Sequence, residues 1–245
     1  MSSPLSLTGF THYFRLITGK YFYLLKISII AICFIPFLIL VWQYQHDQLG
    51  TNPLAYLTYT SGHLSLIFLL ITLSITPLKR LAARIMIKLQ LRYGKRLIDW
   101  NWIIKLRKIF GLFCFFYAAI HLSIYLWFDQ GLEWEYILED IAERPFILVG
   151  MVSFFFLLLM AITSFKFFIQ KLKKKWRIIH MSIYPVAILC VLHYSWLSKM
   201  NTNELIIYAL FTFILLSYRL LIWIGLLKVM QGDTGMEVSN RSPLK

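Results

Sequence analysis

The stretch Ile109–Phe128, IFGLFCFFYAAIHLSIYLWF, decides the fold, because it contains no charged side chain and a single histidine, His121. A helix needs about 20 mainly apolar residues to cross the hydrocarbon core of a bilayer. An ionisable side chain at that depth is costly and is typical of a functional site. The segment therefore predicts a membrane-spanning helix, and His121 is a candidate for a functional role.

The composition extends this prediction to the whole chain. Of its 245 residues, 59% are hydrophobic and 15% are charged, against about 45–50% and about 25% in soluble domains. These figures exclude collagen-like, disordered, disulfide-rich and nucleic-acid-binding proteins. We expect an all-α integral membrane protein, a six-transmembrane-helix bundle. Its predicted spans are Tyr21–Gln43, Tyr59–Pro77, Ile109–Phe128, Phe146–Phe165, Ile178–Leu197 and Leu205–Leu227.

The net charge of +14 is distributed unevenly among the connectors. The connector Leu78–Lys108 holds ten Lys and Arg residues, and Lys166–Arg177 holds six, whereas Asp129–Pro145 holds six acids and one base. Basic connectors are retained on the cytoplasmic side. This pattern predicts a cytoplasmic N-terminal segment (1–20), a membrane domain (21–227) and a cytoplasmic tail (228–245).

Two histidines are predicted at matched depth. His121 lies roughly 18 Å into its span and His193 roughly 22 Å into its own, at about 1.5 Å per residue. Both spans enter from the cytoplasmic side, so both histidines fall in the outer half of the membrane. Facing each other, they could supply both axial ligands of one haem iron. A helix–helix hydrogen bond is the alternative interpretation of either histidine.

His180 lies near the cytoplasmic entry of the fifth span, about 20 Å from His193 along the helix axis. That rise would separate two haems, although an ideal helix places the two side chains some 140° apart, and Pro185 between them could bend it. The matching position on the third span is Arg107, which is no ordinary haem ligand. A lipid headgroup contact is the alternative for His180, and a helix cap or a propionate contact is the interpretation for His63.

The order and spacing of several motifs resemble the MsrQ (YedZ) family, the haem-binding membrane subunit of the periplasmic methionine-sulfoxide reductase system. That family belongs to the ferric-reductase-like transmembrane group. The resemblance covers about Leu24 to Tyr218. It is carried by the motifs LITLSITPL (Leu70–Leu78), AAIHLSIY (Ala118–Tyr125), ERPFILVG (Glu143–Gly150), WRIIH (Trp176–His180) and HYSW (His193–Trp196).

This resemblance implies haem b, one or two per chain, and FMN. It implies an electron-transfer subunit, not the sulfoxide-reducing enzyme itself. Electrons would come from the quinone pool or a cytoplasmic flavin reductase, cross the bacterial inner membrane and reach a periplasmic molybdopterin subunit, MsrP, which supports repair of oxidised periplasmic proteins. His121, His180 and His193 match the family's haem-associated histidines, and Arg107 stands where related oxidases have a fourth histidine.

Two departures and two rival functions accompany the resemblance. The connector Ala82–Lys105 is longer than expected and contains Trp100 and Trp102, and His63 matches no family ligand. A stand-alone transmembrane ferric or metal reductase would need a cytoplasmic FAD/NADPH domain, which we do not expect after the last span. A proton- or metal-coupled transporter lined by histidines is the other rival.

Overall fold

The computed structural model describes residues 22–88, 101–197 and 202–225. In these ranges it contains helices and no strand, and six spans are long and apolar enough to cross a membrane, as predicted. The helices are α2 (Phe22–Gln45), α3 (Pro53–Lys88), α5 (Asn101–Ile124, continued by the π-helical turn η2, Tyr125–Asp129), α6 (Trp134–Glu143), α7 (Pro145–Ile162), α8 (Lys166–Leu172), α9 (Lys174–Met181), α10 (Ile183–Leu197) and α11 (Thr202–Trp223).

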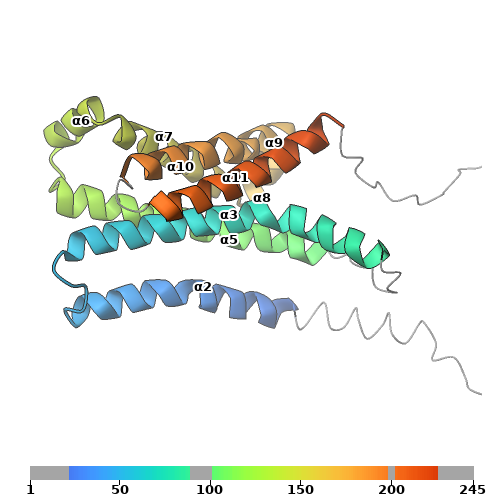
Figure 1. Ribbon diagram of the computed structural model, residues 1–245, viewed down its shortest axis with the longest axis horizontal. Coiled ribbons are helices and arrows are strands. Elements are labelled where there is room, and N and C mark those ends of the chain that lie inside the picture. Colours follow the sequence, from blue (N-terminus) through green and yellow to red (C-terminus); the bar gives the residue numbers. More distant parts are fainter. Residues whose placement is uncertain (1–21, 89–100, 198–201, 226–245) are drawn as a thin grey trace, which may run out of the picture.

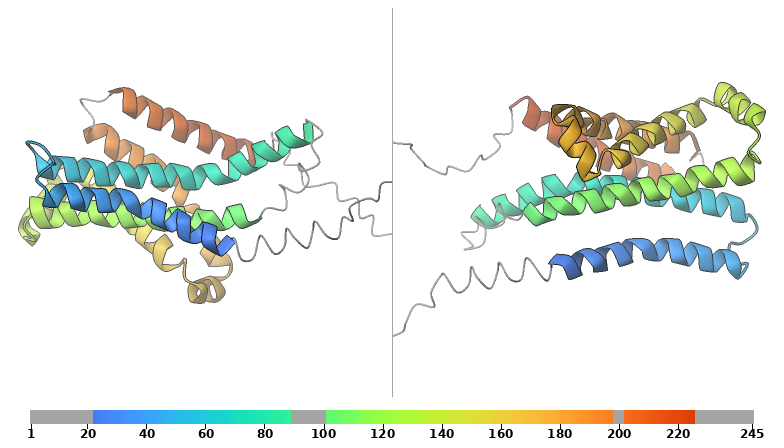
Figure 2. Two further views of the ribbon diagram at one scale, coloured as in Figure 1. Left: turned by 90° about the horizontal axis from the view of Figure 1, so that it is seen from below. Right: turned by 180° about the vertical axis from the view of Figure 1, so that it is seen from behind.

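The spanning helices run along the long axis of the molecule (Figure 1). α3 packs along α5 and α7 packs along α10, while α11 contacts α10 and α3, and α2 contacts α5 (Figures 1 and 2). The short helix α6 covers one end of the bundle, and α8 and α9 lie toward the other. We call these the α6 end and the α9 end.

The core forms where α3 and α5 meet α10. Leu69 and Leu73 of α3, Tyr117 of α5 and Val186 of α10 are all almost fully buried. The outer faces of α2 and α11, by contrast, expose large apolar side chains along their length. Such helices satisfy their backbone polar groups internally and can therefore face lipid.

Several helix boundaries differ from the predicted spans. α3 continues to Lys88 and α5 begins at Asn101, so much of the predicted connector Leu78–Lys108 is helical. The predicted connector Asp129–Pro145 contains the helix α6, which the sequence analysis missed. Charge marks where a span leaves the hydrocarbon, but a helix can continue beyond that point. Both predicted terminal segments and Trp100 lie outside the described residues.

The fifth span is divided in two. α9 ends at Met181 and α10 begins at Ile183, so the break falls at Ser182 and not at Pro185. At this break the Ser182 hydroxyl donates back to the Ile179 carbonyl of α9 (2.6 Å). Pro185 lies in the first turn of α10, where a helix needs no N–H donor. The break therefore separates His180 on α9 from His193 on α10.

Pro77 has a different effect inside α3. A proline in a helix leaves the carbonyl four residues earlier without its usual N–H partner. That carbonyl belongs to Leu73, and it accepts a hydrogen bond from Nη2 of Arg219 on α11 (3.4 Å). The proline thus provides an acceptor for a charged side chain inside the bundle.

We expect Tyr117→Phe to lower the free energy of unfolding by about 1 kcal/mol, the usual net worth of a hydrogen bond. The buried Tyr117 hydroxyl donates to the Cys33 carbonyl (2.8 Å) and so ties α5 to α2. Denaturant unfolding in mixed micelles measures the change. Tyr23→Phe on the exposed face of α2 is the control, and equal stability of the two variants would contradict this role.

Candidate functional site

The structure brings His121 and His193 together near the α6 end. His121 lies on α5 and His193 on α10. Their ring centroids are 6.1 Å apart and the ring planes are nearly perpendicular, at 89°. The matched depth inferred from the sequence therefore corresponds to a direct juxtaposition of the two imidazoles.

Each imidazole is held by a backbone carbonyl of a neighbouring helix. Nδ1 of His121 donates to the carbonyl of Thr58 on α3 (2.8 Å), and Nδ1 of His193 donates to that of Phe146 on α7 (2.7 Å). A carbonyl can only accept, so the hydrogen of each neutral ring resides on Nδ1. Nε2 of each ring then keeps its lone pair, as in metal-ligating histidines.

Two glycines make these hydrogen bonds possible. Gly62 follows Thr58 by four residues, and Gly150 follows Phe146 by four, so each glycine lies one helical turn beyond the accepting carbonyl. A Cβ atom on Gly62 would lie 3.0 Å from the His121 ring, and one on Gly150 would lie 2.8 Å from the His193 ring. The sequence analysis missed that these glycines leave space for the histidine rings. The signal that could have indicated it was a glycine inside an apolar span.

A cavity of about 610 Å³, the histidine cavity, surrounds the two rings. A metal ion about 2.0 Å from an imidazole nitrogen on each side would place the ring centroids about 6 Å apart, which matches the observed spacing. The two rings supply only two ligands, so a metal that brings its remaining ligands in a macrocycle fits this site. No cluster of three or more His, Cys, Asp and Glu suited to a bare metal ion occurs in the described ranges.

His63 also borders the histidine cavity. It lies inside α3, ten residues after the helix begins at Pro53. The predicted role as a helix cap is therefore wrong, because the helix starts well before the predicted span. Cys190 borders the same cavity, whereas Arg107 and His180 do not.

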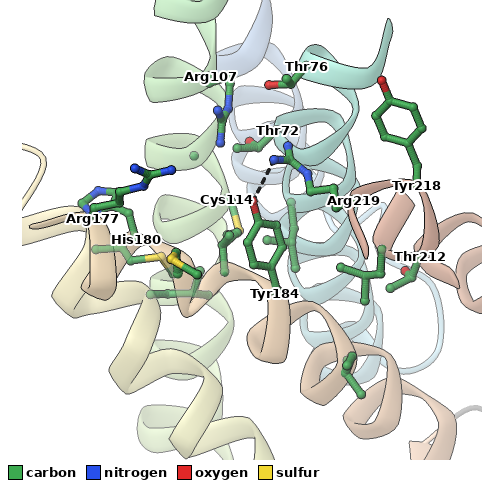
Figure 3. A pocket seen from close by; sticks show the side chains of 18 of the residues that line it. Thr72, Thr76, Arg107, Cys114, Arg177, His180, Tyr184, Thr212, Tyr218 and Arg219 are labelled. Atoms are coloured by element: carbon green, nitrogen blue, oxygen red, sulfur yellow. Dashed lines mark hydrogen bonds between the residues drawn. The ribbon is translucent and has the colours of Figure 1, made fainter. Parts of the chain in front are cut away.

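A second cavity of about 1150 Å³, the arginine cavity, lies toward the α9 end (Figure 3). It contains His180 of α9, Arg107 of α5 and Arg219 of α11, so the predicted pair His180 and Arg107 share one site. Among the described residues that line it there is no aspartate or glutamate. Its cationic side chains are Arg80, Arg107, Lys108, Arg177 and Arg219.

The arginine cavity also collects buried polar atoms that lack hydrogen-bond partners. Across the described residues six such side-chain atoms occur, and five of them line this cavity. Buried polar groups normally have partners, so a ligand with several hydrogen-bond acceptors, most simply an anion, suits this cavity. The five atoms are Thr76 Oγ1, Arg107 Nε, Thr212 Oγ1, Tyr218 OH and Arg219 Nε.

Contacts to neighbouring residues orient Arg219 and His180 in this cavity. The Arg219 guanidinium receives support from the Tyr184 hydroxyl, which accepts from Nη1 (2.7 Å; Figure 3), and from the Leu73 carbonyl. The His180 ring stacks on the Trp176 ring at 4.1 Å, with Nδ1 3.2 Å from the Trp176 carbonyl. The sequence analysis missed Arg219, which lies in the sixth span far from the histidine motifs.

The described spans form a six-helix bundle with facing histidines on two of them, and a family of transmembrane proteins matches this part of the chain. The profile of the family described as "Ferric reductase like transmembrane component" matches residues 61–191. This range is more than half of the chain and includes His121, His180 and Arg107, while His193 lies two residues beyond it.

Curated relatives define the family more narrowly. The chain is 39% identical over 176 residues to a protein of Herminiimonas arsenicoxydans (71% of this chain, 73% of the relative). It is 36% identical over 200 residues to one of Xanthomonas campestris (79% and 84%), and 34% identical over 192 residues to one of Bordetella parapertussis (77% and 85%). Each is named protein-methionine-sulfoxide reductase heme-binding subunit MsrQ. The chain belongs to the MsrQ family, as the motifs predicted.

We expect Gly150→Ala to lower the affinity for iron protoporphyrin by about tenfold or more, as changes beside metal-ligating histidines do. The new Cβ would displace the His193 ring from the Phe146 carbonyl. Absorption titration of the purified apoprotein measures the affinity. Val152→Ala, at an exposed position of the same helix that borders neither cavity, is the control. Equal affinities of the two variants would contradict the proposed role of Gly150.

Proposed function

We propose that this protein is the haem b electron-transfer subunit of a methionine-sulfoxide reductase system. In this proposal His121 and His193 would hold one haem iron between them through their Nε2 atoms. The observation that carries it is their centroid spacing of 6.1 Å, with both Nδ1 atoms bound to carbonyls and both Nε2 atoms available. The iron, when bound, supplies one-electron chemistry by changing between its ferric and ferrous states.

The protein's own residues would position the cofactor and shield it from water. The Thr58 and Phe146 carbonyls fix the orientation of the ligand rings, and apolar side chains such as Leu66 and Ile147 exclude water from the histidine cavity. Burial and axial ligands are the means by which a protein tunes a haem potential. The sulfoxide chemistry itself belongs to the partner, so no residue of this chain is assigned a catalytic role.

The arginine cavity is proposed as the place where electrons enter. Its cations and its orphaned polar atoms suit a cofactor with carboxylates or a phosphate, and a second haem and FMN both have such groups. His180 would contact this cofactor, while Arg107 and Arg219 would bind its anionic groups. A guanidinium stays protonated in proteins and does not ligate iron, so Arg107 is assigned to anion binding.

Leu157 borders both cavities, so the two sites are neighbours across the bundle. With the basic α9 end at the cytoplasmic face, as the positive-inside rule favours, electrons from the quinone pool or a cytoplasmic flavin reductase would pass from the arginine cavity to the histidine cavity. The acidic α6 end would then face the periplasm of a bacterial inner membrane, where a molybdopterin partner, MsrP, would accept them. Both chain termini would be cytoplasmic.

A stand-alone ferric or metal reductase is the second candidate function, because the matched family profile carries the ferric-reductase description. The relatives that cover most of the chain favour the sulfoxide reductase system instead. Sulfoxide reduction by the purified protein together with its periplasmic partner, compared with direct reduction of ferric chelates, distinguishes the two. If the purified protein showed no haem absorption after haem supplementation, the result would favour the other rival function, a proton- or metal-coupled transporter lined by histidines.

We expect His121→Ala and His193→Ala each to remove the low-spin haem signal and most electron delivery to the partner reductase, because each variant would lack one of the two histidine ligands of the iron. Absorption and electron paramagnetic resonance spectra, with a pyridine haemochrome assay, measure the loss. His46→Ala, an exposed histidine after α2, is the control. A full low-spin spectrum in both cavity variants would rule out this pairing.

For the arginine cavity we expect His180→Ala and Arg107→Ala to slow donor-driven reduction by about tenfold or more. The spectrum of the His121–His193 haem should persist, because neither residue borders that cavity. Stopped-flow reduction by quinol and by a flavin reductase gives the rates, and Lys171→Ala, an exposed cation of α8, is the control. Unchanged reduction by both donors would leave His180 as a headgroup contact.

A further inference from the structure

His63 stands at the centre of a polar cluster that the electron path does not use. Three tyrosine rings surround its imidazole: Tyr59 at 4.8 Å, Tyr208 at 5.0 Å and Tyr194 at 5.5 Å between centroids. Glu204, in the first turn of α11, accepts hydrogen bonds from the hydroxyls of Tyr59 and Tyr194. The cluster therefore joins α3, α10 and α11 at the α6 end.

The cluster connects the histidine cavity with the surface. His63 borders that cavity, and its side chain is 18% exposed. Its Nε2 is buried and has no hydrogen-bond partner, but lies 3.6 Å from a carboxylate oxygen of Glu204. The Glu204 side chain is 39% exposed, so it can exchange protons with water. Cavity, imidazole, carboxylate and surface thus follow one another in that order.

An electron that enters the histidine cavity adds a negative charge to a water-poor region, where an uncompensated charge is expensive. Imidazole is the side chain that takes up a proton most readily near neutral pH. A protonated His63 would face the Glu204 carboxylate, and the electron-rich faces of aromatic rings also attract cations. The Glu204 carboxylate and the ring faces would therefore stabilise a proton on His63 when the cavity becomes more negative, against the cost of its partial burial.

We propose that His63 takes up a proton when the cofactor that would occupy the histidine cavity is reduced. Glu204 would connect His63 to the outer aqueous phase. The inference rests on the proposed function. One proton from water passes by way of Glu204 to His63 for each electron that the cavity gains, and it returns when the electron leaves. Glu204 is a carboxylate before and after the transfer, so the net charge of the region stays constant.

Other titratable or charged groups also face this region. Tyr59, Tyr194, Tyr208 and Glu204 surround His63 itself. The histidine cavity is also lined by Tyr125 and Asp129 of η2, Arg144 before α7 and Cys190 of α10, together with His121 and His193. Tyr59 and Tyr194 likewise border the cavity and contact Glu204, but a phenol does not take up a proton near neutral pH, whereas an imidazole does. His63 is therefore the imidazole that borders the cavity, lies beside the exposed Glu204 carboxylate and holds no cofactor in the proposed function.

The test is the pH dependence of the haem midpoint potential of the full-length protein in micelles. Between about pH 5 and 8, where an imidazole titrates, we expect the potential to fall as pH rises. Full coupling changes the reduction equilibrium tenfold per pH unit, which equals 59 mV for one electron. His63→Phe, which keeps an aromatic ring but accepts no proton, should remove most of this slope, and Glu204→Gln should reduce it.

Tyr56→Phe, at the same end but outside the cluster, is the control and should keep the full slope. Redox-difference infrared spectra with ring-labelled histidine should show an imidazolium band on reduction, and His63→Phe should lack this band. A His63 that only held the helices together would not produce the band. If His63→Phe does not assemble, His63→Gln replaces it. A potential independent of pH, or a slope unchanged in the His63 variant, overturns the inference. Absence of the two-histidine haem spectrum contradicts the proposed function itself.

Discussion

Two hydrogen bonds from imidazole to backbone carbonyl fix the spacing on which the rest of the site depends. They orient His121 and His193, and they also link α5 to α3 and α10 to α7. Inside a bilayer a freed imidazole or carbonyl finds no water to replace its partner. The same bonds that present the Nε2 atoms to a cofactor therefore hold together the helix pairs that enclose it, and each bond requires a glycine one turn further along.

The two cavities solve opposite electrostatic problems. The histidine cavity is lined mainly by apolar side chains and brings the His121 and His193 imidazoles together, whereas the arginine cavity gathers five cations from α3, α5, α9 and α11. Charged groups within a membrane are costly unless they find partners. Arg219 donates hydrogen bonds to the Tyr184 hydroxyl and to the Leu73 carbonyl, which lacks its usual helical N–H donor because of Pro77. In the proposed function an anionic ligand in the cavity would offset the rest of this cost.

The sequence was sufficient to predict the six spans and the pairing of His121 with His193, because span length and intramembrane depth follow directly from residue counts. It also placed Arg107 at the height of His180, and both border the same cavity. Features that depend on contacts between distant segments were missed: Gly62 and Gly150 acquire a role only when a ring from another helix lies against them. The break at Ser182 and the helix α6 were missed because hydropathy and charge report the bilayer crossing, not the local backbone.

Leu157 lines both cavities, and this position matters for electron transfer between them. A group bound in either cavity would lie near this side chain. Electron tunnelling weakens exponentially with the thickness of the intervening medium. Leu157 would therefore be part of the medium that an electron crosses between the two cavities, and a change in its size would alter how fast charge crosses the bundle.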